Sequence, residues 1–539
     1  MTGADALLET AREAYAQRDW VTARAGFAEA RARTTLGPDD LCALANCAWW
    51  LGDLDGTIAD LRSAFRQYLA ADRPNRAAMV ALDTGYCLAM RGDRMQGSGW
   101  MQRAARLLAD RPACIEHGCL AYIQWELAFE ASELEAAHEA ADQVRSLAQR
   151  FSDPTLTALG ALAQGRVLIE QGSVRTGMAL LDEAMVAAVS DELEPAWAGS
   201  IYCHLMRVCD EIVDVLRAVE WTKATARWCA SMPGSGPFMG ICRVHRAHVL
   251  CLRGAWEDAE REIAQVCAEL ADFDIEVVAE AEYERGELRR AQGDLSGAEA
   301  SFRESHRLGR DPQPGLASLR LKQGQAGAAM ASIRAALASA RGQALARARL
   351  LPAAIEIALA VEDSERARAW SDELSTTARR YGTSGLGAQS RASTGAVRLA
   401  DGEAGAALTH LKAALSAWHA LAVPYEAARV RTLLAQAYEA LGDHGAAALE
   451  RDAARSTLAH RRQPPDAPAT RDDALTERET QILRMVSSGQ TNQQIATDLV
   501  LSVRTVERHL ATVYRKLGFH GRNARAAAVG YALREIQPI

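Results

Sequence analysis

Lysine is scarce in this 539-residue chain: only four lysines stand among its 61 basic residues, and none of them follows a glycine. The Gly-x-x-x-x-Gly-Lys-Ser/Thr motif of P-loop nucleotide-binding sites is therefore absent. No apolar run approaches the roughly 20 residues that a membrane-spanning helix requires. The first residues, "MTGADALLETAREAY", also lack the basic segment and apolar core of a signal peptide. These absences exclude ATP hydrolysis through a P-loop and predict a protein without a membrane partner.

The sequence shows no pattern typical of disulfide-bonded cysteines or of a catalytic site. The eleven cysteines are an odd number, all precede residue 268, and their spacing is irregular, as expected of reduced thiols in the cytoplasm. No alternating strand pattern indicates a receiver domain, and no constellation indicates a nucleophile with its base. The sequence therefore predicts a cytoplasmic protein that is not an enzyme and carries no cofactor and no metal.

The composition indicates an all-α protein with an uneven distribution of charge. The chain is rich in Ala, Leu, Arg and Glu, which are strong helix formers. Its formal net charge is −8, yet residues 473–539 hold nine basic and six acidic side chains. Between residues 502 and 534 the ratio is seven to one. A basic surface for nucleic acid is therefore confined to the last part of the chain.

A sequence pattern recurs about every forty residues: a turn, often Gly-Asp, followed by a helix with closely spaced alanines. The turn glycines are separated by 40, 80, 82, 39, 31, 78 and 40 residues. They are Gly52, Gly92, Gly172, Gly254, Gly293, Gly324, Gly402 and Gly442. Glycine-free copies such as "EASELEAAHEAADQV" fill the double intervals, and "AQRDWVTARAGFAEARA" opens the series. Because glycine suits the left-handed residue that ends a helix, the pattern predicts about twelve stacked helical hairpins, an α-solenoid with a concave inner surface.

The repeated pattern resembles the tetratricopeptide-repeat superfamily, although the full consensus of that superfamily is absent. The resemblance covers residues 1–458 and implies a helical-repeat domain that senses a ligand or binds a protein. After it, "HRRQPPDAPATRDDA" places three prolines within five residues. Such a segment is typical of a stiff, extended linker. We therefore expect a linker at 459–472 and a separate domain at 473–539.

Three short amphipathic helices are expected after the linker, and each has its own start signal. Thr476 and Thr491 are followed three residues later by Glu479 and Gln494, which is the pattern of a capping box. The third helix begins at Ser502, and its apolar residues form one buried stripe. These stripe residues are Val506, Leu510, Val513 and Leu517. Because basic residues lie opposite the stripe, the segment indicates a helix-turn-helix whose second helix enters the DNA major groove.

The stretch "LTERETQILRMVSSGQTNQQIATDLVLSVRTVERHLATVYRKLG" resembles the LuxR-type helix-turn-helix domain of bacterial transcription regulators. The family pattern Leu-Thr-x-Arg-Glu, Gly-x-Ser/Thr-Asn-x-x-Ile-Ala, Ser-x-x-Thr-Val-x-x-His and Lys-Leu-Gly is present in order. The resemblance implies a four-helix domain, with a last helix near residues 523–535 that pairs subunits in the family. Gln493 and Gln494 depart from the usual Lys and Glu, which weakens one expected phosphate contact.

The same resemblance implies the DNA-contacting residues and the partners. Base contacts are expected from Glu507, Arg508 and Ala511. Phosphate contacts are expected from Asn492, Arg504, Thr505, His509, Arg515 and Lys516. The implied partners are double-stranded DNA, a second copy of the chain in a homodimer on DNA, and RNA polymerase, and activation is the commoner outcome in the family.

One segment interrupts the repeat pattern most, from Trp221 to Trp256. It combines aromatic residues, cysteines and histidines around the Gly/Pro-rich stretch "SMPGSGPF". Loop-broken helical folds offer aromatic-lined pockets of this kind. The residues expected to line a small-molecule pocket are Trp221, Trp228, Cys229, Phe238, Cys242 and His245. The spacing is looser than that of zinc sites, so buried cysteine and hydrogen-bonded histidine are the alternative.

Two interpretations of the whole chain follow. In the first, it is a sequence-specific DNA-binding transcription regulator, an activator, whose repeat region senses an unidentified small molecule or protein. In the second, the helical repeats form a protein-interaction scaffold that the C-terminal module localises to DNA.

Overall fold

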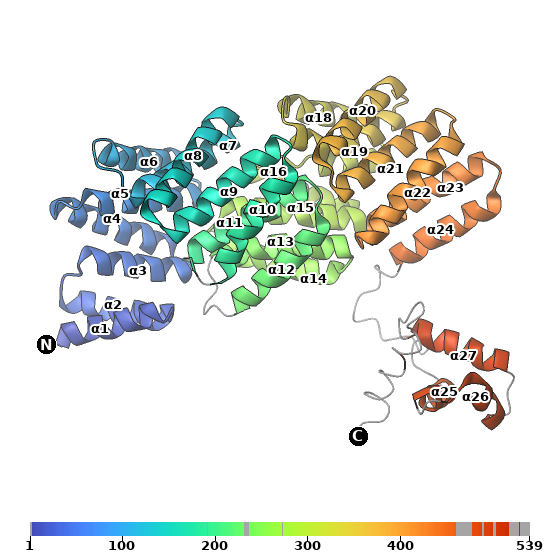
Figure 1. The fold of residues 1–539 in the computed structure, drawn as a ribbon, viewed down its shortest axis with the longest axis horizontal. Helices are drawn as coiled ribbons and strands as arrows, with labels where there is room; N and C mark the ends of the chain where they lie inside the picture. Colours follow the sequence, from blue (N-terminus) through green and yellow to red (C-terminus); the bar gives the residue numbers. More distant parts are fainter. Residues whose placement is uncertain are drawn as a thin grey trace. The chain divides into compact units, whose positions relative to one another are not determined.

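The computed structural model describes residues 3–190, 192–193, 195–230, 237–271, 273–459, 477–487, 490–499, 503–516 and 528. Every regular element among these residues is an α-helix, which confirms the predicted all-α class. The chain divides into two compact units, Met1–Arg462 and Gln463–Ile539 (Figure 1). Among the described helices, none is both long and apolar enough to pass through a bilayer.

The first unit contains twelve helical hairpins within its described residues. The first helices of the hairpins are α1 Gly3–Ala16, α3 Pro38–Trp50, α5 Pro74–Met90, α7 Ile115–Glu130, α9 Pro154–Glu170, α11 Pro195–Glu211, α13 Pro237–Arg253, α15 Ile275–Gln292, α17 Gly315–Lys322, α19 Ala344–Ala360, α21 Ser384–Ala400 and α23 Pro424–Ala440. The second helices are α2 Trp20–Arg33, α4 Leu54–Ala70, α6 Arg94–Leu108, α8 Leu134–Phe151, α10 Val174–Val189, α12 Val215–Ala230, α14 Trp256–Leu270, α16 Leu295–Arg307, α18 Ala326–Ser339, α20 Ser364–Tyr381, α22 Ala404–Ala420 and α24 His444–Ala459.

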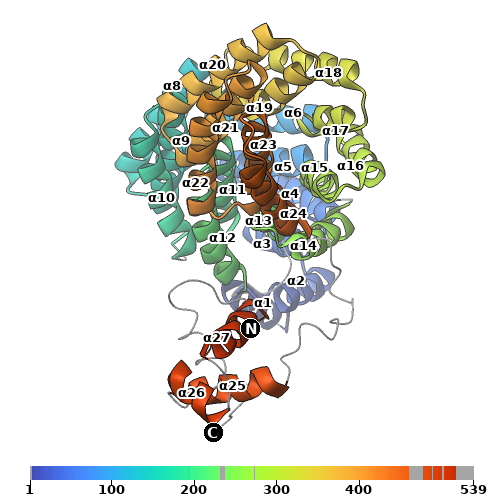
Figure 2. The same ribbon diagram turned by 90° about the vertical axis from the view of Figure 1, so that its right-hand side faces the viewer.

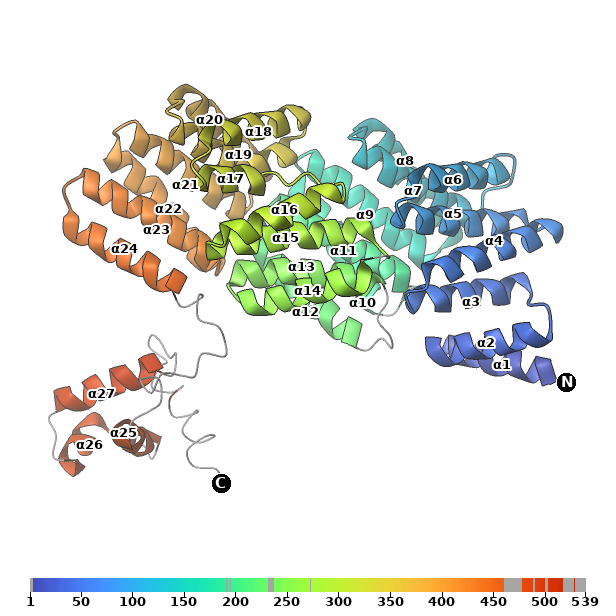
Figure 3. The same cartoon turned by 180° about the vertical axis from the view of Figure 1, so that it is seen from behind.

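The hairpins stack into a tetratricopeptide-like solenoid. Each helix of this unit packs against the next one in the chain, and the first helices of most successive hairpins also contact each other. The array curls as it proceeds, so that the helix pairs are arranged around a common axis in Figure 2. Seen from behind, α13 to α16 lie between the early and the late hairpins (Figure 3). This arrangement confirms the prediction of about twelve hairpins.

The turn inside every one of the twelve described hairpins contains one residue with a positive φ. Eight of these are the turn glycines of the repeat, with φ between 76° and 91°. The other four are Arg18, Ser132, Val213 and Glu362, with φ between 54° and 61°. A side chain in this conformation costs roughly 1–2 kcal/mol relative to glycine, which pays no Cβ penalty there. The glycine-free repeats thus keep the same turn, at a local cost.

The frequent Gly-Asp pair has a simple structural cause. After the left-handed Gly52, the Asp53 amide donates to the Ala48 carbonyl at 2.8 Å, the six-to-one bond of a Schellman motif. The Asp53 carboxylate then accepts the Gly56 amide at 2.8 Å and caps the next helix. Glycine ends one helix and aspartate begins the next, so two residues suffice for the turn.

A small buried residue follows each left-handed residue at a fixed distance. Five positions after the left-handed residue, eleven of the twelve described hairpins have a buried alanine or glycine, and the remaining one has the buried Thr57. At Gly97 a Cβ atom would lie 2.7 Å from the Gly85 carbonyl oxygen. Helices can approach this closely only where the side chain is small, so the recurring alanines of the sequence set the spacing within each hairpin.

The solenoid closes on itself where residues about 170 to 210 positions apart meet. The Arg380 guanidinium donates to the Glu170 carbonyl at 2.8 Å, and the Gln343 amide donates to the Ser132 hydroxyl at 2.8 Å. Helix α11 contacts α19, and helix α13 contacts α23. We call this line of contact the seam. It joins hairpins that are far apart in the sequence into one body.

Candidate functional site

The second unit contains three described helices, α25 Glu477–Ser487, α26 Asn492–Asp498 and α27 Val503–Lys516. All three contact one another. Their core is made of Ile482, Val486, Ile495, Ala496, Val506 and Leu510. The buried stripe expected on the third helix is confirmed at Val506, Leu510 and Val513, whereas Leu517 and the expected fourth helix lie outside the described residues.

The start of α26 confirms the capping box at Thr491. The Gln494 amide donates to the Thr491 hydroxyl at 3.3 Å, and the Thr491 amide donates to the Gln494 side-chain oxygen at 2.8 Å. Two of the free amides at the helix start are thereby satisfied. Glu479 is buried in α25, but its expected partner Thr476 lies outside the described residues.

Arg478, the arginine of the Leu-Thr-x-Arg-Glu motif, has a structural role that the sequence did not reveal. Its Nη2 donates to the carbonyl oxygen of Leu499 at 3.0 Å, at the end of α26. Its Nη1 donates to the Gln481 side-chain oxygen at 2.8 Å. Because Leu499 begins the connection to α27, this arginine ties α25 to the turn between the other two helices.

The outer surface of α27 is the expected DNA-reading face. Glu507 is exposed and His509 is half-buried on this helix, and Asn492 is half-buried at the first position of α26. By the 100° step of an α-helix, positions 504, 508, 511 and 515 fall opposite the buried stripe. The side chains of Arg504, Thr505, Arg508, Ala511, Arg515 and Lys516 lie outside the described residues. Their roles remain predictions.

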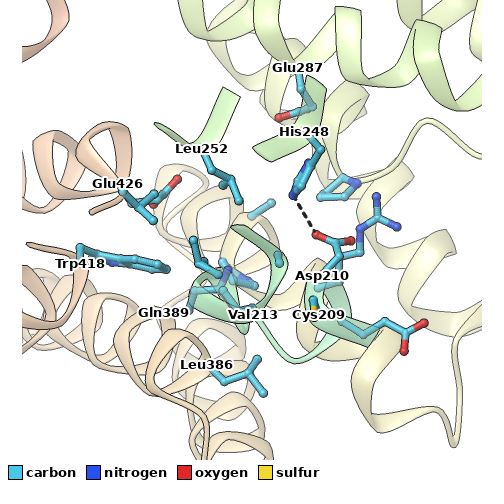
Figure 4. A pocket seen from close by; sticks show the side chains of 18 of the residues that line it. Cys209, Asp210, Val213, His248, Leu252, Glu287, Leu386, Gln389, Trp418 and Glu426 are labelled. Atoms are coloured by element: carbon cyan, nitrogen blue, oxygen red, sulfur yellow. Dashed lines mark ion pairs between the residues drawn. The ribbon is translucent and has the colours of Figure 1, made fainter. Parts of the chain in front are cut away.

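The repeat region has a cavity of its own at the seam. It holds about 260 Å³ and is lined by residues of α11, α12, α13, α15, α17, α19, α21, α22 and α23. Figure 4 shows Trp418 and Leu252 at one end and the His248–Asp210 pair at the other. Glu426 lies beside Trp418 in the same view, so charged and apolar side chains line the cavity together.

His248 makes two close polar contacts where it lines the cavity. Its Nε2 lies 3.3 Å from Asp210 Oδ1, and its Nδ1 lies 3.1 Å from Glu284 Oε2. Burial by itself lowers the pKa of His248, but the charge and hydrogen bond of Glu284, together with the charge of Asp210, raise it to about 9. A protonated imidazole between two carboxylates therefore joins α11, α13 and α15 at neutral pH.

The residues that the sequence suggested for a pocket lie mostly in the packed interior. The Trp221 indole donates to Asp182 Oδ1 at 2.9 Å, and Trp228 packs against the core. His245 meets the ring of Tyr202 edge-on at 5.8 Å, and burial lowers the pKa of His245 to about 4. None of these three lines the cavity at the seam.

Cys229 and Cys242 lie together at the end of α12 and the start of α13. Both are buried, and their hydrogen bond lowers the pKa of the Cys229 thiol and, with burial, raises that of Cys242. The side chain of Phe238 lies outside the described residues. The pocket predicted around these residues stays a prediction. His248, three residues beyond His245 on the same helix, and Leu252 are the members of the segment that line the cavity.

Comparison with known proteins places the C-terminal segment in a family. Residues 473–529 match the family described as "Bacterial regulatory proteins, luxR family". The chain is 44% identical over 52 residues to the nitrate/nitrite response regulator protein homolog of Haemophilus influenzae, and 45% identical over 49 residues to the uncharacterized response regulatory protein YgeK of Escherichia coli K12. These matches cover 10% and 9% of this chain and only 25% and 33% of the two relatives. The C-terminal unit therefore contains a LuxR-type helix-turn-helix domain.

Solved helical-repeat structures resemble the chain at low identity. The Cut9–Hcn1 hetero-tetramer of the APC/C matches 99% of this chain and 97% of that chain, with a TM-score of 0.44 and 15% identity. A Rap protein complexed with competence and sporulation factor matches 72% of this chain and 100% of that chain, with a TM-score of 0.39 and 13% identity. Likenesses at these scores carry no argument about ligands or partners.

Proposed function

We propose that this chain is a sequence-specific DNA-binding transcription regulator, an activator, whose helical-repeat region receives the signal. The observation that carries the proposal is the LuxR-type match at residues 473–529 on three mutually packed helices. In such a domain the third helix enters the major groove with its N-terminal half against the base edges. The helix assigned to this role is α27.

Glu507, Arg508 and Ala511 are the residues proposed to read bases. Glu507 is exposed on α27, one position beyond the buried Val506. A carboxylate at this place can accept from the amino group of cytosine, and an arginine can donate two bonds to guanine. An acidic side chain on the DNA-reading face raises the selectivity for particular bases and lowers the general affinity for the phosphate backbone. We therefore propose a site with G·C pairs opposite the start of α27.

Phosphate contacts are assigned to Asn492, Arg504, Thr505, His509, Arg515 and Lys516. Three of these side chains, Arg504, Arg515 and Lys516, are permanent cations. Three released counterions give a slope of about −3 in log affinity against log salt for one module, and about −5 for two. Affinity of a single module is then modest, so a homodimer on a two-fold site supports the proposal best. RNA polymerase is the further partner that activation requires.

The repeat region is proposed as the input. Its stacked hairpins offer a large surface to a protein partner, and the cavity at its seam has room for a small molecule. Since distant hairpins meet at this seam, a bound molecule would favour one winding of the solenoid over another. A regulator needs such a difference between two states.

Selection of DNA from a random library by the full chain tests the proposal. The wild-type chain should enrich one sequence with two-fold symmetry. Arg508→Ala should lose the enrichment, while Arg484→Ala, an exposed arginine on α25, should retain it as the matched control. Circular dichroism of both variants checks that the helices persist. Enrichment of no sequence by the wild-type chain, or an unchanged preference in Arg508→Ala, would contradict the proposal.

A further inference from the structure

The connection between α6 and α7, which joins the third hairpin to the fourth, places a thiol beside an imidazole. Cys114 is the residue before α7, and His117 is the third residue of that helix. The Cys114 Sγ lies 3.0 Å from His117 Nδ1. The other ring nitrogen, Nε2, lies 3.1 Å from the carbonyl oxygen of Leu108, at the end of α6. Both Cys114 and His117 are half-buried, so the pair lies at the surface of the repeat region rather than in its core.

The Leu108 carbonyl decides how the His117 ring is protonated. A carbonyl oxygen only accepts hydrogen bonds, so Nε2 must carry a proton and donate it. In the neutral ring Nδ1 then has a free lone pair, and that lone pair faces the thiol of Cys114. His117 can therefore accept the thiol proton directly. A nucleophile, a base within hydrogen-bond reach and a third group that orients the base are the three parts of an activated nucleophile.

Cys114 needs such a base in order to react at neutral pH. Burial and the nearby Glu116 carboxylate raise the pKa of the Cys114 thiol. At the usual pKa of about 8.5 a thiol is only about 3% thiolate at pH 7, and a raised pKa makes this fraction smaller still. The thiolate is the form that attacks. Transfer of the proton to His117 during the reaction removes this limit.

Other half-buried cysteines have different surroundings. The Cys42 thiol donates to the Tyr68 hydroxyl at 3.9 Å, and the Cys267 thiol donates to the Glu282 carboxylate at 3.5 Å. Burial raises the pKa of both thiols to about 11. A phenol is no base at neutral pH, and a carboxylate opposes a second negative charge beside it. Of the five half-buried cysteines in the described part of the chain, only Cys114 has its sulfur against an imidazole nitrogen.

We propose that Cys114 is a site of reversible thiolation by low-molecular-weight disulfides, with His117 as its general base. His117 Nδ1 takes the proton of the thiol, and the Cys114 sulfur attacks one sulfur of the reagent R–S–S–R. The S–S bond of the reagent breaks as the new S–S bond forms, and the departing thiolate takes the proton from His117. The products are a mixed disulfide at Cys114 and one thiol R–SH, so no other oxidant is needed. Attack by a second thiol on the mixed disulfide reverses the step.

Incubation of the reduced full chain with bis(2-hydroxyethyl) disulfide, a small uncharged reagent, tests the proposal. The reaction is stopped with acid at increasing times, and mass spectrometry of the digested chain gives the rate of modification at each cysteine. At pH 7, Cys114 should react at least about tenfold faster than Cys42 and Cys267, because those thiols have less thiolate and no base beside them. Excess dithiothreitol should restore the free thiol.

His117→Gln separates the base from the structural role of the ring. Glutamine keeps a donor for the Leu108 carbonyl but offers no basic nitrogen. Exchange at Cys114 should therefore slow by at least about tenfold at pH 7, since the base otherwise compensates for the small thiolate fraction. The remaining rate should rise about tenfold for each pH unit up to the thiol pKa, whereas the wild-type rate should depend less steeply on pH.

Two further variants complete the test. Glu116→Gln should speed exchange at Cys114, because it removes the negative charge that opposes the thiolate. A merely structural role of Glu116 would not produce this gain. His138→Gln is the matched control, since His138 is an exposed histidine on α8, and it should leave the rate at Cys114 unchanged. Circular dichroism checks the fold of each variant.

Three results would overturn the proposal: no modification of Cys114, equal rates at Cys114 and Cys42, or an unchanged rate in His117→Gln. Neither Cys114 nor His117 is assigned to DNA contact or to the cavity at the seam. Failure of the chain to select a DNA sequence would therefore contradict the proposed function and leave the thiolation site intact, and the reverse holds as well.

Discussion

Replacing Gly385 by alanine should open the seam of the solenoid. Gly385 is the second residue of α21, and a Cβ added there would lie 2.2 Å from the Val213 carbonyl oxygen and 2.5 Å from the Val213 side chain. Val213 is itself the left-handed residue of its turn, with φ of 54°. Because the nearest atom belongs to the backbone, it cannot rotate away. Helix α21 must separate from the turn between α11 and α12.

The magnitude follows from two opposed terms. Overpacking of a close contact costs roughly 1–3 kcal/mol, whereas alanine gains about 0.8–1 kcal/mol over glycine as a helix former. The difference between the two terms is a destabilisation of Gly385→Ala by up to about 2 kcal/mol. Gly405→Ala is the matched control, since Gly405 is also the second residue of its helix, α22, and an added Cβ there meets no atom within 4 Å. That variant should be stabilised.

Hydrogen exchange followed by mass spectrometry is the suitable assay, because stacked repeats can open locally rather than all at once. In Gly385→Ala, amides of α11, α12 and α21 should exchange faster than in the wild-type chain, with little change in α1 to α4. Equal protection in Gly385→Ala and Gly405→Ala would refute the close approach at the seam.

Four further predictions concern single residues. Glu362→Gly should stabilise the repeat region by about 0.5–1 kcal/mol in thermal melts, since glycine relieves the left-handed strain at φ of 60° but costs chain entropy; an unchanged or lower melting temperature would contradict this. Arg478→Ala should weaken the C-terminal unit by about 1.5–3 kcal/mol, because the bond to the Leu499 carbonyl is charge-assisted, and faster exchange confined to α25 to α27 is the expected readout. The raised pKa of His248 means that its pairing stabilises the fold fully below about pH 6.5 and is lost as pH rises through about 9; His248→Gln should flatten stability against pH in that window, and an unaltered profile would disprove the pairing. Glu507→Gln should relax the base preference at one position of the selected DNA by about 1–3 kcal/mol, whereas a uniform loss over all positions would assign Glu507 to the fold.

The predictions from sequence succeeded where local rules decide. Glycine after a helix indicated left-handed turns, and those glycines have positive φ. The spacing of Val506, Leu510 and Val513 indicated a buried stripe, and Thr491 with Gln494 indicated a capping box. These features depend on residues within a few positions of one another, so the pattern alone carries them.

The segment from Trp221 to Trp256 shows what composition leaves undetermined. Its aromatic residues and cysteines suggested a pocket, yet Trp221 bonds to Asp182 on α10 and His245 packs on Tyr202 of α11. A helical pattern shows which residues share a face but not which neighbour covers that face. The cavity at the seam is instead lined by residues such as His248 and Arg349, which no sequence motif singled out.

The sequence by itself determined the helical hairpins, their turns, the small residues between them and the helix-turn-helix at the end, because each of these depends on short-range sterics and hydrogen bonds. Only the tertiary structure decided the seam and its cavity. Their walls come from residues as far apart as Met206 and Arg429, and they meet because the rotation from one hairpin to the next accumulates over many repeats. The total rotation depends on how every pair of neighbouring hairpins packs, so no single sequence motif predicts where the two sides of the seam meet.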